Sequence, residues 1–128
     1  MEEYADLIGC KFKIHGRTKE EGLDCYGLAI EVLRRNGITL PDLWYDEETF
    51  SCRENLHFTL VENYVEKVEK LEKNCIIEIK IQGLPKHIGV YIGNGKMIHT
   101  LESVGVCIVP VSKYKHCIMG YLKVKSNS

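Results

Sequence analysis

A cysteine stands at position 25, at the start of the segment with the strongest helical pattern in the chain. Apolar residues follow at helical spacing, namely Leu28, Ala29, Val32 and Leu33. A thiol in the first turn of a helix lies near unpaired N–H groups and the positive end of the helix dipole, which both favour the thiolate. We therefore expect a lowered pKa for the Cys25 thiol and take it as a candidate nucleophile. The alternative is a small buried core residue, because free cysteines are among the most buried residue types.

Two histidines could complete a catalytic group with this thiol. His87 begins one predicted strand and His99 lies near the end of the next, and the Asn-Gly pair at 94–95 between them is typical of a tight hairpin turn. A thiolate nucleophile needs a general base, and the base needs a partner that orients its ring. Cys25, His87 and His99 can supply the nucleophile, the base and the orienting group, in that order.

The register of this hairpin decides whether the two imidazoles can meet. A plain two-residue turn would place them on opposite faces, because side chains alternate along a strand. A three-residue turn centred on Asn94, or a bulge with the same effect, sets His99 opposite Gly89, so that His87 and His99 share a face. We predict that register, with the two Cβ atoms diagonally apart by about 7–8 Å.

Other uses of these residue types are open to the sequence as well. Cys25, His87 and His99 would fit a zinc site by residue type, but close-spaced ligand pairs are absent and we predict no metal and no cofactor. The six cysteines are scattered without a Cys-x-x-Cys pair, and those at 75, 107 and 117 lie in apolar runs that indicate core positions. His57 and His116 are interpreted as structural histidines.

Length and composition limit the classes of function. The 128 residues, 45% of them hydrophobic, indicate one globular domain spanning 1–128. A net charge of −1 gives no electrostatic support for nucleic-acid binding. The chain has no apolar run long enough to span a membrane and no signal-peptide pattern at its start, so we expect a protein that is cytoplasmic as synthesised.

Helical patterns come first and strand patterns follow, which predicts an α+β fold with an antiparallel sheet. The predicted helical segments are a short helix at 3–9, the helix after Cys25 ending near Gly37, and a mainly helical segment at 46–72. The segment 10–23 is predicted to be irregular. The predicted strands are at 75–81, 87–92, 96–100, 104–111 and 117–124. In the first strand, we expect isoleucines on the buried face and Glu78 on the solvent face.

Three segments resemble the NlpC-type cysteine peptidases, papain-like bacterial and phage enzymes that cut peptidoglycan stem peptides, typically at the γ-D-glutamyl–diamino-acid bond. They are residues 24–28 (DCYGL), 87–95 (HIGVYIGNG) and 97–100 (MIHT). The resemblance implies a papain-like α+β fold, in which N-terminal helices, among them the nucleophile helix, pack on a C-terminal antiparallel sheet of about five strands. It also implies Cys25 as nucleophile, His87 as base, His99 as the polar third member, and no cofactor.

Four residues are candidates for substrate binding. The resemblance suggests that Asp24, beside the nucleophile, receives a substrate amine. His15 lies in the segment that leads to the nucleophile helix and either lines the cleft or is a solvated loop residue. Trp44 either lines a substrate groove or covers the core. Tyr26 corresponds to an aromatic residue that often follows the cysteine in the phage-tail branch of the family.

Residues 12–17 (FKIHGR) and 37–41 (GITLP) look like that phage-tail branch. The expected partners are therefore peptidoglycan stem peptides and phage-tail proteins. Two other functions stay open. One is a catalytically dormant assembly component of a phage tail with the same fold, and the other is a cytosolic thiol amidase or acyltransferase that acts on a substrate outside the cell wall.

Overall fold

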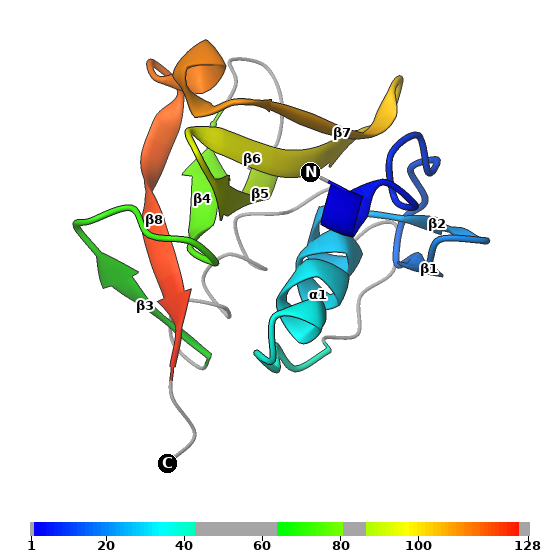
Figure 1. Cartoon of the computed structure of the whole chain (residues 1–128), viewed down its shortest axis with the longest axis horizontal. Coiled ribbons are helices and arrows are strands. Elements are labelled where there is room, and N and C mark those ends of the chain that lie inside the picture. The colour runs from blue at the N-terminus through cyan, green and yellow to red at the C-terminus, as the bar shows by residue number, and fades with distance from the viewer. Residues whose placement is uncertain (1, 43–63, 81–86, 126–128) are drawn as a thin grey trace.

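The computed structural model describes residues 2–42, 64–80 and 87–125. In this part of the chain, one α-helix packs against a six-stranded antiparallel sheet with the strand order β3-β8-β4-β5-β6-β7. Figure 1 shows α1 between this sheet and a two-stranded ribbon. The elements are η1 (Glu2–Tyr4), β1 (Arg17–Thr18), β2 (Gly22–Leu23), α1 (Cys25–Arg35), β3 (Val65–Val68), β4 (Ile76–Ile79), β5 (His87–Gly93), β6 (Lys96–Leu101), β7 (Gly105–Pro110), η2 (Val111–Tyr114) and β8 (Ile118–Val124). The predicted α+β class is confirmed.

Both ends of α1 are set by local sequence. Asp24 caps the first turn, because its carboxylate accepts a hydrogen bond from the Gly27 N–H. At the other end Gly37 has a φ of 78°, and its N–H donates to the Arg34 carbonyl while the Ile38 N–H donates to the Leu33 carbonyl. This pair of bonds is a Schellman motif, so the predicted helix end near Gly37 is confirmed. No helix in the described ranges has the length and apolar character to cross a membrane.

The main core lies between α1 and the sheet. Fully buried residues of the helix pack with residues from all six strands of the sheet, and the set includes Leu28, Val32, Leu33, Ile76, Val90, Ile98 and Leu122. A second apolar cluster, centred on Ile77, Ile79 and Met97, lies on the other face of the sheet. The central strands are therefore buried on both faces.

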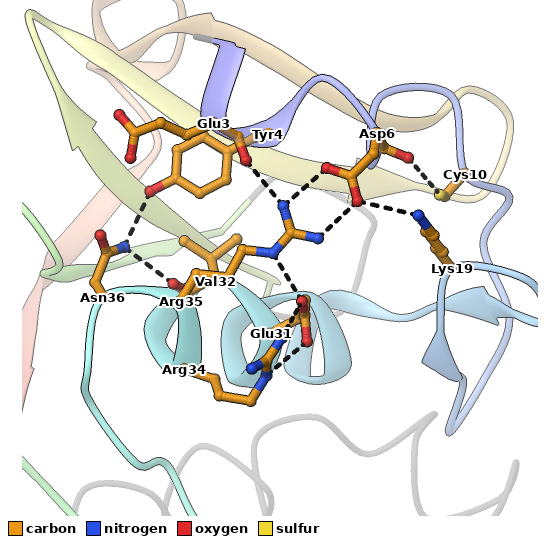
Figure 2. A network of polar contacts seen from close by, with 10 residues as sticks. All are labelled: Glu3, Tyr4, Asp6, Cys10, Lys19, Glu31, Val32, Arg34, Arg35 and Asn36. Atoms are coloured by element: carbon orange, nitrogen blue, oxygen red, sulfur yellow. Dashed lines mark hydrogen bonds and ion pairs between the residues drawn. The ribbon is translucent and has the colours of Figure 1, made fainter.

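Arg35 ties the N-terminal segment to the last turn of α1 (Figure 2). Its guanidinium donates to both carboxylate oxygens of Asp6, at 2.8 and 2.7 Å, and to the Glu3 carbonyl at 2.8 Å. Its Nε donates to Glu31 on the same helix at 2.7 Å. The Arg35 hydrogen bonds hold the pKa of the Asp6 carboxyl far below its usual range. This network holds residues 3–6 against the last turn of α1.

Two expectations for the first 23 residues need correction. The predicted helix at 3–9 is only a 3-10 turn at Glu2–Tyr4, and Ile8 is 46% exposed instead of packing with Tyr4 and Leu7. Residues 5–9 form turns instead of a helix, and Gly9 and Cys10 exchange backbone hydrogen bonds with Val106 of β7. The segment 10–23 contains the β1–β2 ribbon instead of being fully irregular.

Two expectations for the later segments are also wrong. Residues 65–68 form β3, an edge strand paired with β8, so the sheet has six strands instead of about five. The valines at 65 and 68 suit a strand as well as a helix face, and pairing with β8 decides between them. Glu78 is buried, because the main core covers one face of β4 and the second apolar cluster covers the other. The rest of the predicted 46–72 helix up to residue 63 lies outside the described residues.

Gly27 lies where residues 15–17, here called the approach segment, cross the first turn of α1. A Cβ at this position would lie 2.2 Å from the Gly16 carbonyl oxygen and 2.9 Å from Nη1 of Arg17. Both neighbours belong to the segment that leads to the site, so a side chain here would push that segment away from the helix.

We expect Gly27→Ala to lower the free energy of unfolding by about 1–3 kcal/mol, the usual cost of overpacking. Helix propensity alone would make Gly27→Ala more stable by about 1 kcal/mol. A decrease in the free energy of unfolding would therefore show that the new Cβ clashes with the approach segment. Urea unfolding measures the effect, with Arg34→Ala on the exposed face of α1 as the control. Unchanged or increased stability of Gly27→Ala would show that the approach segment does not pack tightly here.

Candidate active site

Asp24 joins three parts of the site. Its carboxylate is fully buried. One oxygen accepts from the Gly27 N–H at 2.7 Å and lies 3.2 Å from Nη1 of Arg17. The other accepts from the backbone N–H of His15 at 2.6 Å. This carboxylate therefore holds the approach segment against the start of α1.

Cys25 is the first residue of α1. It is 4% exposed and belongs to the main core cluster. Its position places the thiol in the field of the helix N-terminus, as the sequence predicts. α1 contacts β5 and β6, the two strands that carry the histidines.

Arg17 links the approach segment to its surroundings through several contacts. Its Nε donates to Asp42 at 2.9 Å and its Nη1 donates to the Gly16 carbonyl at 2.9 Å. The guanidinium carbon also lies 5.7 Å from the centre of the Tyr26 ring. His15 has a φ of 59°, an unusual conformation for a residue with a side chain, and its bond to Asp24 helps hold it there.

The hairpin of β5 and β6 has the predicted effect on the histidines. Gly93 pairs with Lys96 across the turn, and a bulge between Tyr91 and Gly93 shifts the register so that Val90 pairs with Ile98. That register sets His99 opposite Gly89. The prediction that a bulge brings His87 and His99 to one face is confirmed, because Nε2 of His87 and Nδ1 of His99 lie 2.9 Å apart.

Gly89 makes room for this pair. It lies between the histidines on their shared face, and a Cβ there would lie 3.3 Å from the Cβ of His99 and 3.2 Å from the sulfur of Met97. The two imidazole centres are 5.1 Å apart, with the rings tilted by 58°.

His99 is held neutral by its surroundings. Its side chain has no solvent exposure, and burial, with a smaller contribution from the nearby Lys113 charge, lowers its pKa to about 4. Tyr114 of η2 lies against it, with ring centres 5.4 Å apart and the planes at 72°. Nε2 of His99 has no hydrogen-bond partner among the described residues.

The other candidate residues lie in different surroundings. Tyr26 is fully buried and its hydroxyl donates to the Pro41 carbonyl, so it serves the core. Burial raises the pKa of its hydroxyl well above its usual value. The side chain of His15 is half-buried beside Asp24. Trp44 and His57 lie outside the described residues, and His116 is exposed.

The structure brings together no metal site in the part of the chain that it describes. No group of three or more His, Cys, Asp or Glu side chains there could hold a metal ion. Cys10, Cys75, Cys107 and Cys117 are free thiols, as is Cys25. Burial raises the pKa of the Cys10 and Cys107 thiols, which makes them poor nucleophiles.

The model of the NlpC/P60 family matches residues 9–121. The chain belongs to the NlpC/P60 family. It is 28% identical over 112 residues to the murein DD-endopeptidase MepS/murein LD-carboxypeptidase of Escherichia coli K12, a match that covers 84% of this chain and 51% of that protein. It is 32% identical over 117 residues to the gamma-DL-glutamyl hydrolase of Bacillus subtilis 168, covering 88% of this chain and 25% of that protein.

A solved structure gives the fold of the same family. The crystal structure of the NlpC/p60 domain of the peptidoglycan hydrolase SagA matches with a TM-score of 0.60 and 17% identity, covering 98% of this chain and 94% of that one. The chain thus spans nearly all of that domain. In contrast, it spans about half or less of the two relatives matched by sequence.

Two residues of this NlpC/P60 site were missed by sequence reasoning. Tyr114 lies on a 3-10 turn, and nothing in its sequence spacing points to contact with His99. Arg17 belongs to the segment that resembles the phage-tail branch, but an isolated arginine in a loop is usually interpreted as a solvated residue. The residues around Arg17 in the sequence give no sign that its side chain contacts the buried carboxylate of Asp24.

The lowered pKa of His99 makes stability depend on pH. The unfolded chain binds a proton at this histidine near its ordinary pKa, whereas the folded protein binds one only near pH 4. The contribution of His99 is therefore complete above about pH 6.5 and is lost as the pH falls towards 4, up to about 3 kcal/mol. Urea unfolding between these pH values should show a shallower pH dependence for His99→Gln than for wild type. The exposed His116→Gln is the matched control, and equal slopes for wild type and His99→Gln would contradict the assignment.

Proposed function

We propose that this chain is a thiol hydrolase of peptidoglycan stem peptides, with Cys25 as nucleophile, His87 as general base and His99 as the group that orients His87. The observation that carries the proposal is the 2.9 Å contact between Nε2 of His87 and Nδ1 of His99. That contact occupies one ring nitrogen of His87 and leaves the other, Nδ1, for the proposed proton transfer from the Cys25 thiol. A base oriented by a third group is the arrangement that an activated nucleophile requires.

The substrate class comes from the named relatives. One is named as a murein endopeptidase and carboxypeptidase, and the other as a gamma-DL-glutamyl hydrolase. We infer that this domain cleaves an amide bond of the stem peptide, and within it the γ-D-glutamyl–diamino-acid bond. The proposal concerns the NlpC/P60 domain, which is the part that this chain shares with those longer proteins.

The reaction follows from the proposed roles. His87 takes the thiol proton of Cys25 on Nδ1, and the thiolate attacks the amide carbonyl carbon. The backbone N–H of Cys25, at the helix N-terminus, stabilises the oxyanion. The carbon–nitrogen bond then breaks, His87 gives its proton to the leaving amine, and a thioester remains. Water, deprotonated by His87, releases the carboxylate and restores the thiol, so the cycle needs no cofactor.

The proposed role of Asp24 is positioning. It caps α1 and holds the backbone of His15, which supports the helix start without touching substrate. Tyr26 supports the same turn from the core. Substrate contacts of His15 and Trp44 stay predictions. Association with a phage tail, the location in the cell, and the dormant or non-wall alternatives also stay predictions from the sequence.

Cys25→Ala should abolish hydrolysis of purified stem-peptide fragments, with a loss of at least about a thousand-fold, because no other group replaces the nucleophile. Mass spectrometry of the products identifies the bond that is cut. Cys117→Ala, a half-buried cysteine in the second apolar cluster, is the control and should keep activity. A Cys25→Ala protein that still cleaves the fragments would refute the nucleophile. A wild type that cleaves γ-glutamyl amides but no wall fragment would support the non-wall amidase.

The effect of His87 on the reactivity of the Cys25 thiol can be measured without a substrate. We expect Cys25 to be alkylated selectively below the ordinary thiol pKa of about 8.5, and His87→Ala to move its pH profile upward by removing the imidazolium beside the thiolate. Mass spectrometry resolves each cysteine, and Cys10 and Cys107, with their raised pKa values, serve as internal references. Reaction of all described cysteines at the same pH in both proteins would favour a dormant tail component.

A further inference from the structure

The two histidines have four ring nitrogens, and one of them, Nε2 of His99, has no hydrogen-bond partner among the described residues. Nε2 of His87 and Nδ1 of His99 share a single hydrogen bond, so one of them donates and the other accepts. The remaining nitrogen of His99, Nε2, is buried and has no hydrogen-bond partner among the described residues. The structure therefore raises the question of which nitrogen of His99 carries the proton.

The chemistry proposed above allows only one answer. If His87 is to take the thiol proton on Nδ1, its single proton must already lie on Nε2, which then donates to His99. If His87 is already charged beside the thiolate, Nε2 again carries a proton and again donates. In both states Nδ1 of His99 accepts, so the proton of neutral His99 lies on Nε2. The opposite tautomer of His99 would put the His87 proton on Nδ1, the nitrogen that the proposed mechanism needs free to accept the thiol proton.

We propose that Tyr114 is a positioning residue, whose ring accepts the Nε2–H of His99 and so selects the tautomer that makes His87 a base. The ring centres lie 5.4 Å apart in an edge-to-face arrangement, the geometry in which an N–H can point at an aromatic face. The proposal rests on the proposed function of Cys25 and His87. It adds a fourth residue to their chain of contacts.

The surroundings of Tyr114 fit this role. The Lys113 ammonium also lies beside the ring, 5.8 Å from its centre. Burial, with a smaller contribution from the same Lys113 charge, lowers the pKa of His99 and so favours a neutral ring with a single proton. A buried N–H with no other partner gains even from a weak acceptor, because its alternative is to stay unpaired.

The turn that carries Tyr114 is tied to the hairpin that carries the histidines. The Val111 N–H donates to the Gly95 carbonyl at 2.8 Å, and the Tyr114 carbonyl accepts from the Cys117 N–H at 2.7 Å. Gly95 belongs to the tight turn between β5 and β6, and its N–H donates to the Tyr91 hydroxyl at 2.9 Å. The turn thus positions Tyr114 and the two histidines together.

Nitrogen-15 NMR of the histidine rings tests the tautomer directly in wild-type protein. We expect His99 to be protonated on Nε2 above pH 6, with the attached proton shifted to high field by the Tyr114 ring. A proton on Nδ1 would overturn the proposal. This measurement needs neither activity nor a variant, so it decides the question even if the domain proves not to cleave peptidoglycan.

Two variants test the role of the ring. Tyr114→Phe keeps the aromatic face and should keep the Nε2–H tautomer, with kcat within about twofold of wild type. Tyr114→Leu removes the face and should mix the tautomers, lower kcat about tenfold with little change in KM, and shift the Cys25 alkylation profile to higher pH. Tyr121→Leu, in the same apolar cluster, is the control for general loss of packing. Equal kcat and alkylation profiles for the Phe and Leu variants would overturn the proposal. If Cys25 reactivity is independent of His87, the proposed function fails instead.

Discussion

The carboxylate of Asp24 has no exposed surface, and the start of α1 and the approach segment both depend on it. A buried carboxylate costs several kcal/mol to desolvate, so it must be offset by donors that are close and well aligned. Backbone N–H groups of Gly27 and His15 and the Arg17 guanidinium supply them. Because two of these donors belong to the approach segment, the same bonds that cap the helix also place that segment against Cys25. Gly27 is needed for the same reason, since any side chain there would separate the two.

The second constraint is the register of one hairpin. Positive φ values at Asn94 and Gly95 make a tight turn, which by itself would send the two histidines to opposite faces. One bulge between Tyr91 and Gly93 reverses that outcome. Gly89 then leaves the space across which the two rings meet. A single extra residue in one strand thus decides whether the protein has a histidine pair at all.

The features that the sequence predicted correctly are local or rest on strict alternation. The end of α1 at Gly37, the Asn-Gly turn and the shared face of His87 and His99 follow from residue type and spacing over a few positions. The errors come from long-range pairing. The valines of β3 fit either a helix face or an edge strand until β8 selects the strand, and Glu78 is buried because distant parts of the chain cover both faces of β4. Tyr114 was missed because its contact with His99 joins a turn to a strand fifteen positions earlier with no periodic signal.

Because His99 is neutral, it can orient the His87 ring but adds little charge stabilisation to the proposed nucleophile and base. A carboxylate in this place would stabilise a charged His87 by direct attraction, whereas a neutral imidazole orients the ring with little gain in charge stabilisation. Burial keeps His99 neutral down to about pH 4. In the proposed site, the charge separation between thiolate and imidazolium must then be supported mainly from the thiol side, by the N–H groups and dipole of α1. The cap formed by Asp24 and the tautomer of His99 are therefore complementary, because one holds the field at the sulfur and the other aims the base at it.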